Sequence, residues 1–213
     1  DDAEVEAAVD KGVQARNQNG GQSCIAAKRF IIHEAVYDEF VNKLVDAFEE
    51  LTVGDPMNEE TDIGSQADPG LMAELHEQVQ TSVESGATVE TGGEPLDREG
   101  AFYPPTVLTG GCPVDTEETF GPVAAVYEVA DEDEAIELAN NTRFGLGASL
   151  WTEDRTRGQR LARDIEAGCV YINEMTSSDP RVPFGGIKDA GYGRELSEAG
   201  IKEFVNRKTA WIQ

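Results

Sequence analysis

The central motif of the chain is Asn19-Gly-Gly-Gln-Ser-Cys24. It is followed directly by the apolar run Ile25-Ala-Ala-Lys-Arg-Phe-Ile-Ile32. Paired glycines permit positive φ angles and let a ligand approach the backbone closely. The apolar run predicts a buried strand that fixes the cysteine at a cleft. Nearby N–H groups can activate such a thiol or stabilise an oxyanion formed by its attack. The pattern fits a catalytic thiol, and it also fits an ordinary buried cysteine.

The length and the cysteine content favour one intracellular domain. A chain of 213 residues can bury a sizeable core. No apolar run is long enough to cross a bilayer, and the acidic start is unlike a signal peptide. Three scattered cysteines form no disulfide framework, which favours a reducing, cytoplasmic setting.

The charge is strongly negative, with 42 acidic against 17 basic residues and a net charge of −25. Such a field repels nucleic acid and anionic membranes, so we expect neither as a partner. Because 39% of the residues are hydrophobic and regularly spaced, disorder is disfavoured. The composition indicates a folded, halophilic protein whose self-repulsion is screened by salt.

Alternating helices and strands predict an α/β fold with an open, mostly parallel, twisted sheet and flanking helices. Apolar spacing predicts helices over 3–16, 36–51, 71–85, 132–141, 156–166 and 196–205. Strands are predicted from Cys24 to Ile32 and over 87–91, 102–108, 123–129, 148–151, 169–173 and 209–213. Pro104 and Pro105 place the strand over 102–108 at a sheet edge or interrupt it.

Two further segments carry possible chemistry. The segment Glu117-Glu-Thr-Phe-Gly-Pro122 places carboxylates before an aromatic ring. It fits a site for a sugar diol and a flat heterocycle, and it also fits a solvated acidic turn. The segment 183–195 contains four glycines, which predicts a loop whose backbone lies close to a ligand or another segment.

The remaining candidate residues favour structural roles. His33 is nine residues after Cys24 at the end of a predicted strand, too far for a Cys-His dyad. Two separated histidines and the lack of a CxxC motif give a metal site no support. Cys112 and Cys169 are interpreted as structural.

Three segments in this order resemble the aldehyde dehydrogenase superfamily: Asn19 to Cys24, Glu118 to Pro122, and Pro183 to Gly186. The ordered set is specific, and the resemblance extends over essentially the whole chain. It implies that Cys24 is the nucleophile, that Glu118 holds the nicotinamide ribose, and that Phe120 lies beside the nicotinamide. It also implies that Phe184 lies near the substrate entrance.

The resemblance implies oxidation of an aldehyde with NAD or NADP through a thiohemiacetal and a thioester on Cys24. In this family a cofactor-binding domain and a Glu-Leu-Gly-Gly motif precede the region that resembles this chain. No residue here matches them. We therefore expect residues 1–206 to be the catalytic domain of a longer enzyme, without its cofactor domain and inactive alone.

Two segments, 22–30 and 173–181, resemble the succinate-semialdehyde dehydrogenase branch, in which a serine and an arginine bind the distal carboxylate. Ser178 matches the serine, and Arg16 or Arg181 is the candidate for the positive charge. Gln18 stands where some relatives carry an arginine. The second cysteine of some members is absent, because Ile25 follows Cys24.

The last residues, 207–213, resemble the family's C-terminal strand, which joins a neighbouring subunit's sheet, so we expect a homo-oligomer, a dimer or a tetramer. An internal edge strand is the alternative. Two other functions stay open. A cysteine esterase or acyl transferase would need a histidine beside Cys24, and a non-catalytic domain would serve only subunit association.

Overall fold

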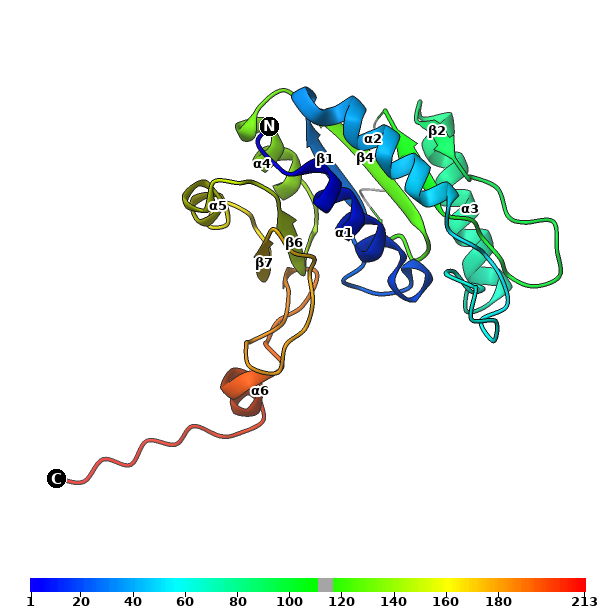
Figure 1. Ribbon diagram of the computed structural model, residues 1–213. Coiled ribbons are helices and arrows are strands. Elements are labelled where there is room, and N and C mark those ends of the chain that lie inside the picture. Colours follow the sequence, from blue (N-terminus) through cyan, green and yellow to red (C-terminus); the bar gives the residue numbers. More distant parts are fainter. Residues whose placement is uncertain (111–116) are drawn as a thin grey trace.

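The computed structural model describes residues 1–110 and 117–213, so Cys112 lies outside the described residues. Its main sheet has the strand order β1-β4-β3-β2 (Figure 1). Strands β1 (Arg29–His33) and β3 (Thr106–Thr109) both run parallel to the central β4 (Val123–Val129). Strand β2 (Thr88–Thr91) is antiparallel to β3 at one edge. The predicted open, mostly parallel α/β sheet is confirmed.

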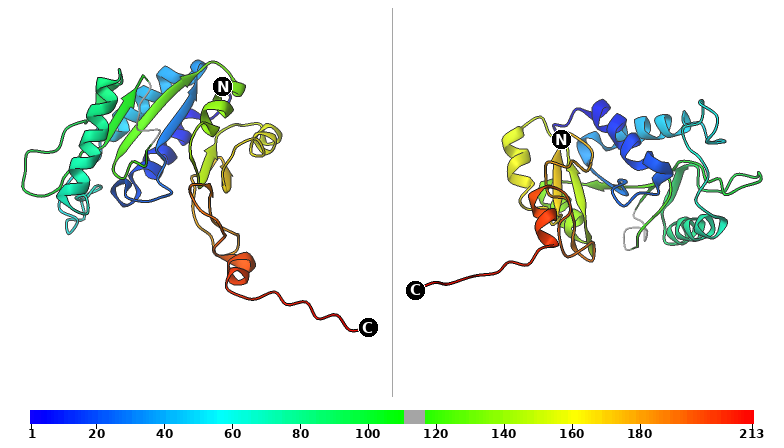
Figure 2. Two further views of the ribbon diagram at one scale, coloured as in Figure 1. Left: turned by 180° about the vertical axis from the view of Figure 1, so that it is seen from behind. Right: turned by 90° about the horizontal axis from the view of Figure 1, so that it is seen from below.

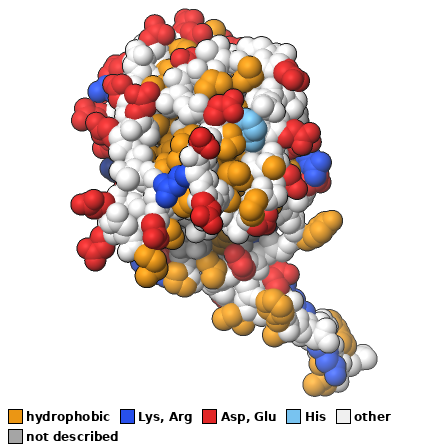
Figure 3. Space-filling view, turned by 90° about the vertical axis from the view of Figure 1, so that its right-hand side faces the viewer, with side chains coloured by type: hydrophobic (Ala, Val, Ile, Leu, Met, Phe, Trp, Pro, Cys, Tyr) orange, Lys and Arg blue, Asp and Glu red, His pale blue; other side chains and the backbone are white. Residues whose placement is uncertain are grey.

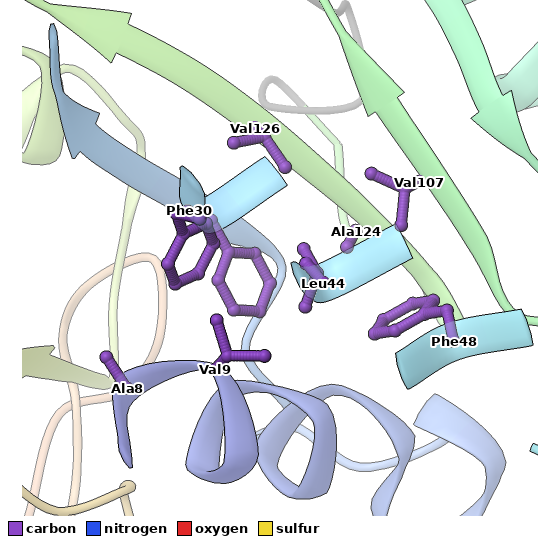
Figure 4. Close-up of a cluster of buried hydrophobic side chains, with 9 residues drawn as sticks. Ala8, Val9, Phe30, Leu44, Phe48, Val107, Ala124 and Val126 are labelled. Carbon is purple, nitrogen blue, oxygen red and sulfur yellow. The ribbon is translucent and has the colours of Figure 1, made fainter. Parts of the chain in front are cut away.

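Helices cover both faces of this sheet. Helices α1 (Val5–Asn17) and α2 (Glu34–Glu49) lie on one face and α3 (Pro69–Glu84) on the other (Figure 2). The two-residue period of β4 explains the arrangement, since successive side chains of a strand point to opposite faces. Ala124 and Val126 pack with α1 and α2 (Figure 4), whereas Val123 and Ala125 pack with α3.

The rest of the chain forms a smaller part beside β1 (Figure 1). Two strand pairs organise it, a parallel β6–β7 pair and an antiparallel β5–β8 pair. In chain order its elements are α4 (Glu132–Asn140), β5 (Phe144–Gly145), β6 (Gly147–Leu150), α5 (Arg155–Leu161), β7 (Cys169–Ile172), β8 (Ile187–Lys188) and α6 (Ser197–Glu203).

Three predicted elements begin at least four residues later or end at least four residues earlier than expected. Strand β1 begins only at Arg29, because a turn follows Cys24. Strand β3 begins at Thr106, immediately after the two prolines, which have no N–H to donate to a ladder. Helix α5 ends at Leu161, and the Asn140 side chain binds the turn that follows, accepting from the Glu166 N–H (2.7 Å) and donating to the Asp164 carbonyl (2.8 Å).

The predicted strand over 209–213 is wrong within this chain. These residues form no strand with any described segment and extend away from the sheet (Figure 1). Trp211 and Ile212 are 89% and 92% exposed. The internal edge strand is therefore excluded for the described chain, and pairing with a second subunit stays a prediction.

The surface carries the excess of acidic residues. Asp and Glu side chains are spread over the face drawn in Figure 3, with far fewer Lys and Arg side chains between them. Within residues 1–110 and 117–213, no helix combines the length and the apolar character that a bilayer crossing requires.

Candidate active site

A glycine turn carries the candidate nucleophile. Helix α1 ends at Asn17, and the short helix η1 (Gln18–Gly21) follows with left-handed backbone at Asn19, Gly20 and Gly21 (φ of 53°, 63° and 75°). The Asn19 side chain donates to the Gln22 carbonyl (3.0 Å) and closes the turn. Cys24 comes directly after it and is exposed. The alternative of an ordinary buried cysteine is therefore wrong.

The turn lies directly against the segment that contains Glu118 and Phe120. The Gly121 N–H donates to the Gly21 carbonyl (3.2 Å). A Cβ added to Gly21 would lie 2.2 Å from the Gly121 carbonyl oxygen, so only a glycine fits this contact. This contact brings together two motifs that lie about a hundred residues apart in the sequence.

A polar loop supports the turn from the other side. The Gln22 side-chain oxygen accepts from the Ala67 N–H (2.8 Å). Gln66 is 2% exposed, and its side-chain nitrogen lies 3.5 Å from the Gly20 carbonyl. The sequence predicted the region between α2 and α3 only as an irregular loop. This loop therefore supports the turn of residues 19–22 that precedes Cys24.

Lys28 lies between the two motifs. Its Nζ is 3.4 Å from the Cys24 carbonyl and 5.5 Å from the centre of the Phe120 ring. Burial, and then the charge of Arg16, lower the pKa of Lys28 to about 8, against the opposing effects of Glu118 and Cys24. Sequence reasoning did not select Lys28, although a charge inside an apolar run was a usable signal. Gln66 gave no such signal.

Two hollows meet at Cys24. The larger, about 640 Å³, is a groove that Cys24 and Glu118 both line, together with Lys28. The smaller, about 300 Å³, is lined by Cys24 and by Phe184 from the glycine-rich segment. Phe184 is fixed there by two backbone hydrogen bonds with Glu195 (2.9 and 2.7 Å). Cys24 thus shares one hollow with Glu118 and the other with Phe184.

The candidate residues for the distal carboxylate of the substrate lie elsewhere. Ser178 and Arg181 are exposed and line neither hollow. The Arg181 guanidinium pairs with Asp179, with Nη2 to Oδ2 at 2.6 Å, and lowers the pKa of that carboxyl to about 2. Arg16 is fully buried and donates from Nη2 to the Gly21 carbonyl (2.7 Å). A substrate contact for Arg16 conflicts with this burial.

Neither histidine serves the thiol as a base. His33 Nδ1 accepts from the Ala35 N–H (3.1 Å) and caps the start of α2. His76 Nδ1 contacts the Tyr103 hydroxyl (3.2 Å). A cysteine esterase would need one of these rings at Cys24, so the described geometry does not favour that function.

Fold and site together define a class of protein, an α/β domain that presents an exposed thiol in a groove. The chain belongs to the aldehyde dehydrogenase family, whose family model matches residues 1–210. The family resemblance and the fold expected from it are thereby confirmed.

Named relatives are similar over the whole chain. A succinate-semialdehyde dehydrogenase [NADP(+)] of Mycobacterium avium is 53% identical over 99% of this chain and 45% of its own length. Succinate-semialdehyde dehydrogenase [NADP(+)] 1 of Mycobacterium tuberculosis is 52% identical over 99% of this chain and 47% of its own length. The chain therefore spans about half the length of the curated relatives it matches.

Solved structures agree with the fold. The succinic semialdehyde dehydrogenase of Streptococcus pyogenes, in complex with NADP+, superposes with a TM-score of 0.96 at 38% identity. The match covers 100% of this chain and 47% of that one. A betaine aldehyde dehydrogenase of Staphylococcus aureus in complex with NAD+ matches with a TM-score of 0.93 at 32% identity, over 96% of this chain and 42% of that one.

Proposed function

We propose that this chain is the catalytic part of an NAD(P)-dependent aldehyde dehydrogenase that oxidises succinate semialdehyde or a similar semialdehyde to the carboxylate. The contact between Gly21 and Gly121 supports the proposal, because it joins the turn before the exposed Cys24 to the segment that contains Glu118 and Phe120. The names of the relatives agree with this substrate class.

The residues at the groove fit a nicotinamide cofactor. Glu118 is exposed, lines the groove and is in no ion pair with a described residue, so its carboxylate is free to accept hydrogen bonds from a ribose diol. Phe120 is half-buried and offers a ring against which a flat heterocycle can pack. Bound there, NAD or NADP supplies the acceptor for the hydride that the aldehyde carbon loses.

Cys24 performs the covalent chemistry. Its thiolate attacks the aldehyde carbon, a C–S bond forms, and the carbonyl oxygen becomes an oxyanion. The Cys24 N–H donates to no described residue and is available to that oxyanion. Lys28 donates to the Cys24 carbonyl and so holds the next peptide unit, between Cys24 and Ile25. Oxidation gives a thioester, and its hydrolysis releases the carboxylate and the free thiol.

Ser178 and Arg181 are proposed to bind the distal carboxylate of the substrate. Both side chains are exposed, and Asp179 orients the Arg181 guanidinium. A charged hydrogen bond contributes about 1.5–3 kcal/mol, or roughly 10- to 100-fold in affinity.

A comparison of succinate semialdehyde with butanal in the complete enzyme tests the substrate class. Arg181→Met is expected to raise the KM for the semialdehyde about tenfold or more and to leave butanal unchanged. Arg155→Met removes another exposed arginine and serves as the control. Equal effects of Arg181→Met on both aldehydes would contradict the assignment.

The residues 207–213 are proposed to join the sheet of a second subunit, in a dimer or tetramer. Their apolar side chains are exposed and unpaired in the described chain. Light scattering of the complete protein with and without these residues tests this. An unchanged mass after their removal would contradict it.

The charge of −25 supports a cytoplasm rich in salt as the working environment. The unfolding temperature is expected to rise when KCl is raised from low to molar concentration, because screening weakens the repulsion among carboxylates. An unfolding temperature independent of salt would argue against halophilic adaptation.

A further inference from the structure

Arg16 has an unusual environment. It is 0% exposed, and only its Nη2 has a partner, the Gly21 carbonyl at 2.7 Å. Its Nε and Nη1 are buried without a hydrogen-bond partner in the described part of the chain. No carboxylate of residues 1–110 or 117–213 forms a salt bridge with it, and burial lowers its pKa to about 9.

This arrangement is unfavourable for stability. A buried charge without a charged partner costs several kcal/mol in desolvation, and each unpaired donor adds to that cost. A methionine would fill the same space with an apolar stem and without that penalty. Residues that lower the stability of the fold in this way are expected at positions that serve function.

The one bond that Arg16 makes lies at the junction of the two motifs. The Gly21 carbonyl accepts from Arg16 Nη2 and from the Gly121 N–H. Gly121 directly follows Phe120 and lies three residues after Glu118. The guanidinium therefore fixes the oxygen atom that couples the Cys24 turn to the segment 118–121.

We propose that Arg16 is a positioning residue that holds the Cys24 turn and the Glu118–Phe120 segment in register through the Gly21 carbonyl. It touches neither substrate nor cofactor. Without its donor, the Gly21 carbonyl keeps only the longer bond from Gly121, so the two segments are held together less firmly. A misplacement of about 1 Å between reacting groups costs roughly 100-fold in rate.

Hydrogen exchange of the complete protein tests the coupling directly. In Arg16→Met, the amides of 19–24 and 117–121 are expected to exchange about tenfold faster or more, because local opening of these segments becomes easier. The amides of β4, at 123–129, are expected to keep their rates. Leu44→Ala, which opens a cavity in the core of α2, is the matched control for a purely structural loss.

Kinetics and stability complete the test. Arg16→Met is expected to lower kcat about tenfold or more while the unfolding temperature stays equal or rises. Leu44→Ala is expected to lower the unfolding temperature while kcat, measured well below it, is retained. Arg16→Lys restores a donor to the Gly21 carbonyl and should recover most of the exchange protection.

The kinetic part of the inference rests on the proposed function. The exchange experiment needs no catalytic activity, so it tests the role of Arg16 separately from the proposed function. Unchanged exchange in both segments of Arg16→Met would overturn the inference. If that variant does not fold, the same three measurements on Arg16→Leu, which also lacks the donor to the Gly21 carbonyl, decide. Faster exchange or a lower kcat at an unchanged unfolding temperature then supports the inference, and any other result overturns it. A wild-type protein that oxidises no aldehyde would instead overturn the proposed function.

Discussion

Substitution of Gly21 by alanine perturbs the contact on which the site depends. The added Cβ would lie 2.2 Å from the Gly121 carbonyl oxygen, and contacts below 3.0 Å force a shift. The two segments must therefore separate by about 0.8 Å, close to the displacement of about 1 Å that costs roughly 100-fold in rate. At a φ of +75°, alanine also costs about 1–2 kcal/mol in backbone strain.

Gly20→Ala is the matched control. Gly20 has a similar φ of +63°, but its added Cβ would meet only the ends of the Gln22 and Gln66 side chains, at 3.3 and 4.0 Å. Both variants carry the strain, which for a chain of this size lowers the unfolding temperature by about 2–4 °C per kcal/mol. Only Gly21→Ala is expected to lose about 100-fold in kcat. Equal kcat values for the two variants would refute the reasoning.

Two further predictions concern charged groups of the groove. In steady-state kinetics of the complete enzyme, Glu118→Gln is expected to raise the KM for the cofactor about tenfold. The neighbouring Glu117→Gln is expected to leave this KM unchanged. Equal KM values for the two variants would contradict the role of Glu118. Lys28 has a folded-state pKa of about 8, below the ordinary value of 10.5, so the unfolded chain binds more protons between these pH values. Its contribution to the free energy of unfolding therefore rises as pH increases from 8 towards 10.5. Lys28→Met should remove this rise, as measured by chemical unfolding at several pH values. An identical pH profile for the wild-type protein and Lys28→Met would contradict the prediction.

The sheet could be predicted from the sequence because its strands have a clear apolar pattern. Strand β4 has the bounds Val123–Val129 that its run of apolar residues predicts. The turn after α5 could not be predicted, since the Asn140 side chain that binds it lies more than twenty residues earlier in the chain. Tertiary contacts of this kind override local propensity.

The residues that carry the chemistry were easier to select than those that hold them. Cys24 and Glu118 were visible in short motifs with distinctive glycines and an aromatic neighbour. The roles of Arg16 and Gln66 depend on burial against backbone carbonyls, which no local pattern reports. Arg16 was consequently expected at the substrate, although its charge faces the inside of the fold.

Mass spectrometry of the complete enzyme, quenched in acid during turnover with NADP+ and succinate semialdehyde, tests the central claim most directly. If Cys24 is the nucleophile, its peptide should carry the mass of a succinyl thioester, and the peptide of the half-buried Cys169 should not. Product formation with no acyl group on Cys24, or with the acyl group on another cysteine, would contradict the account.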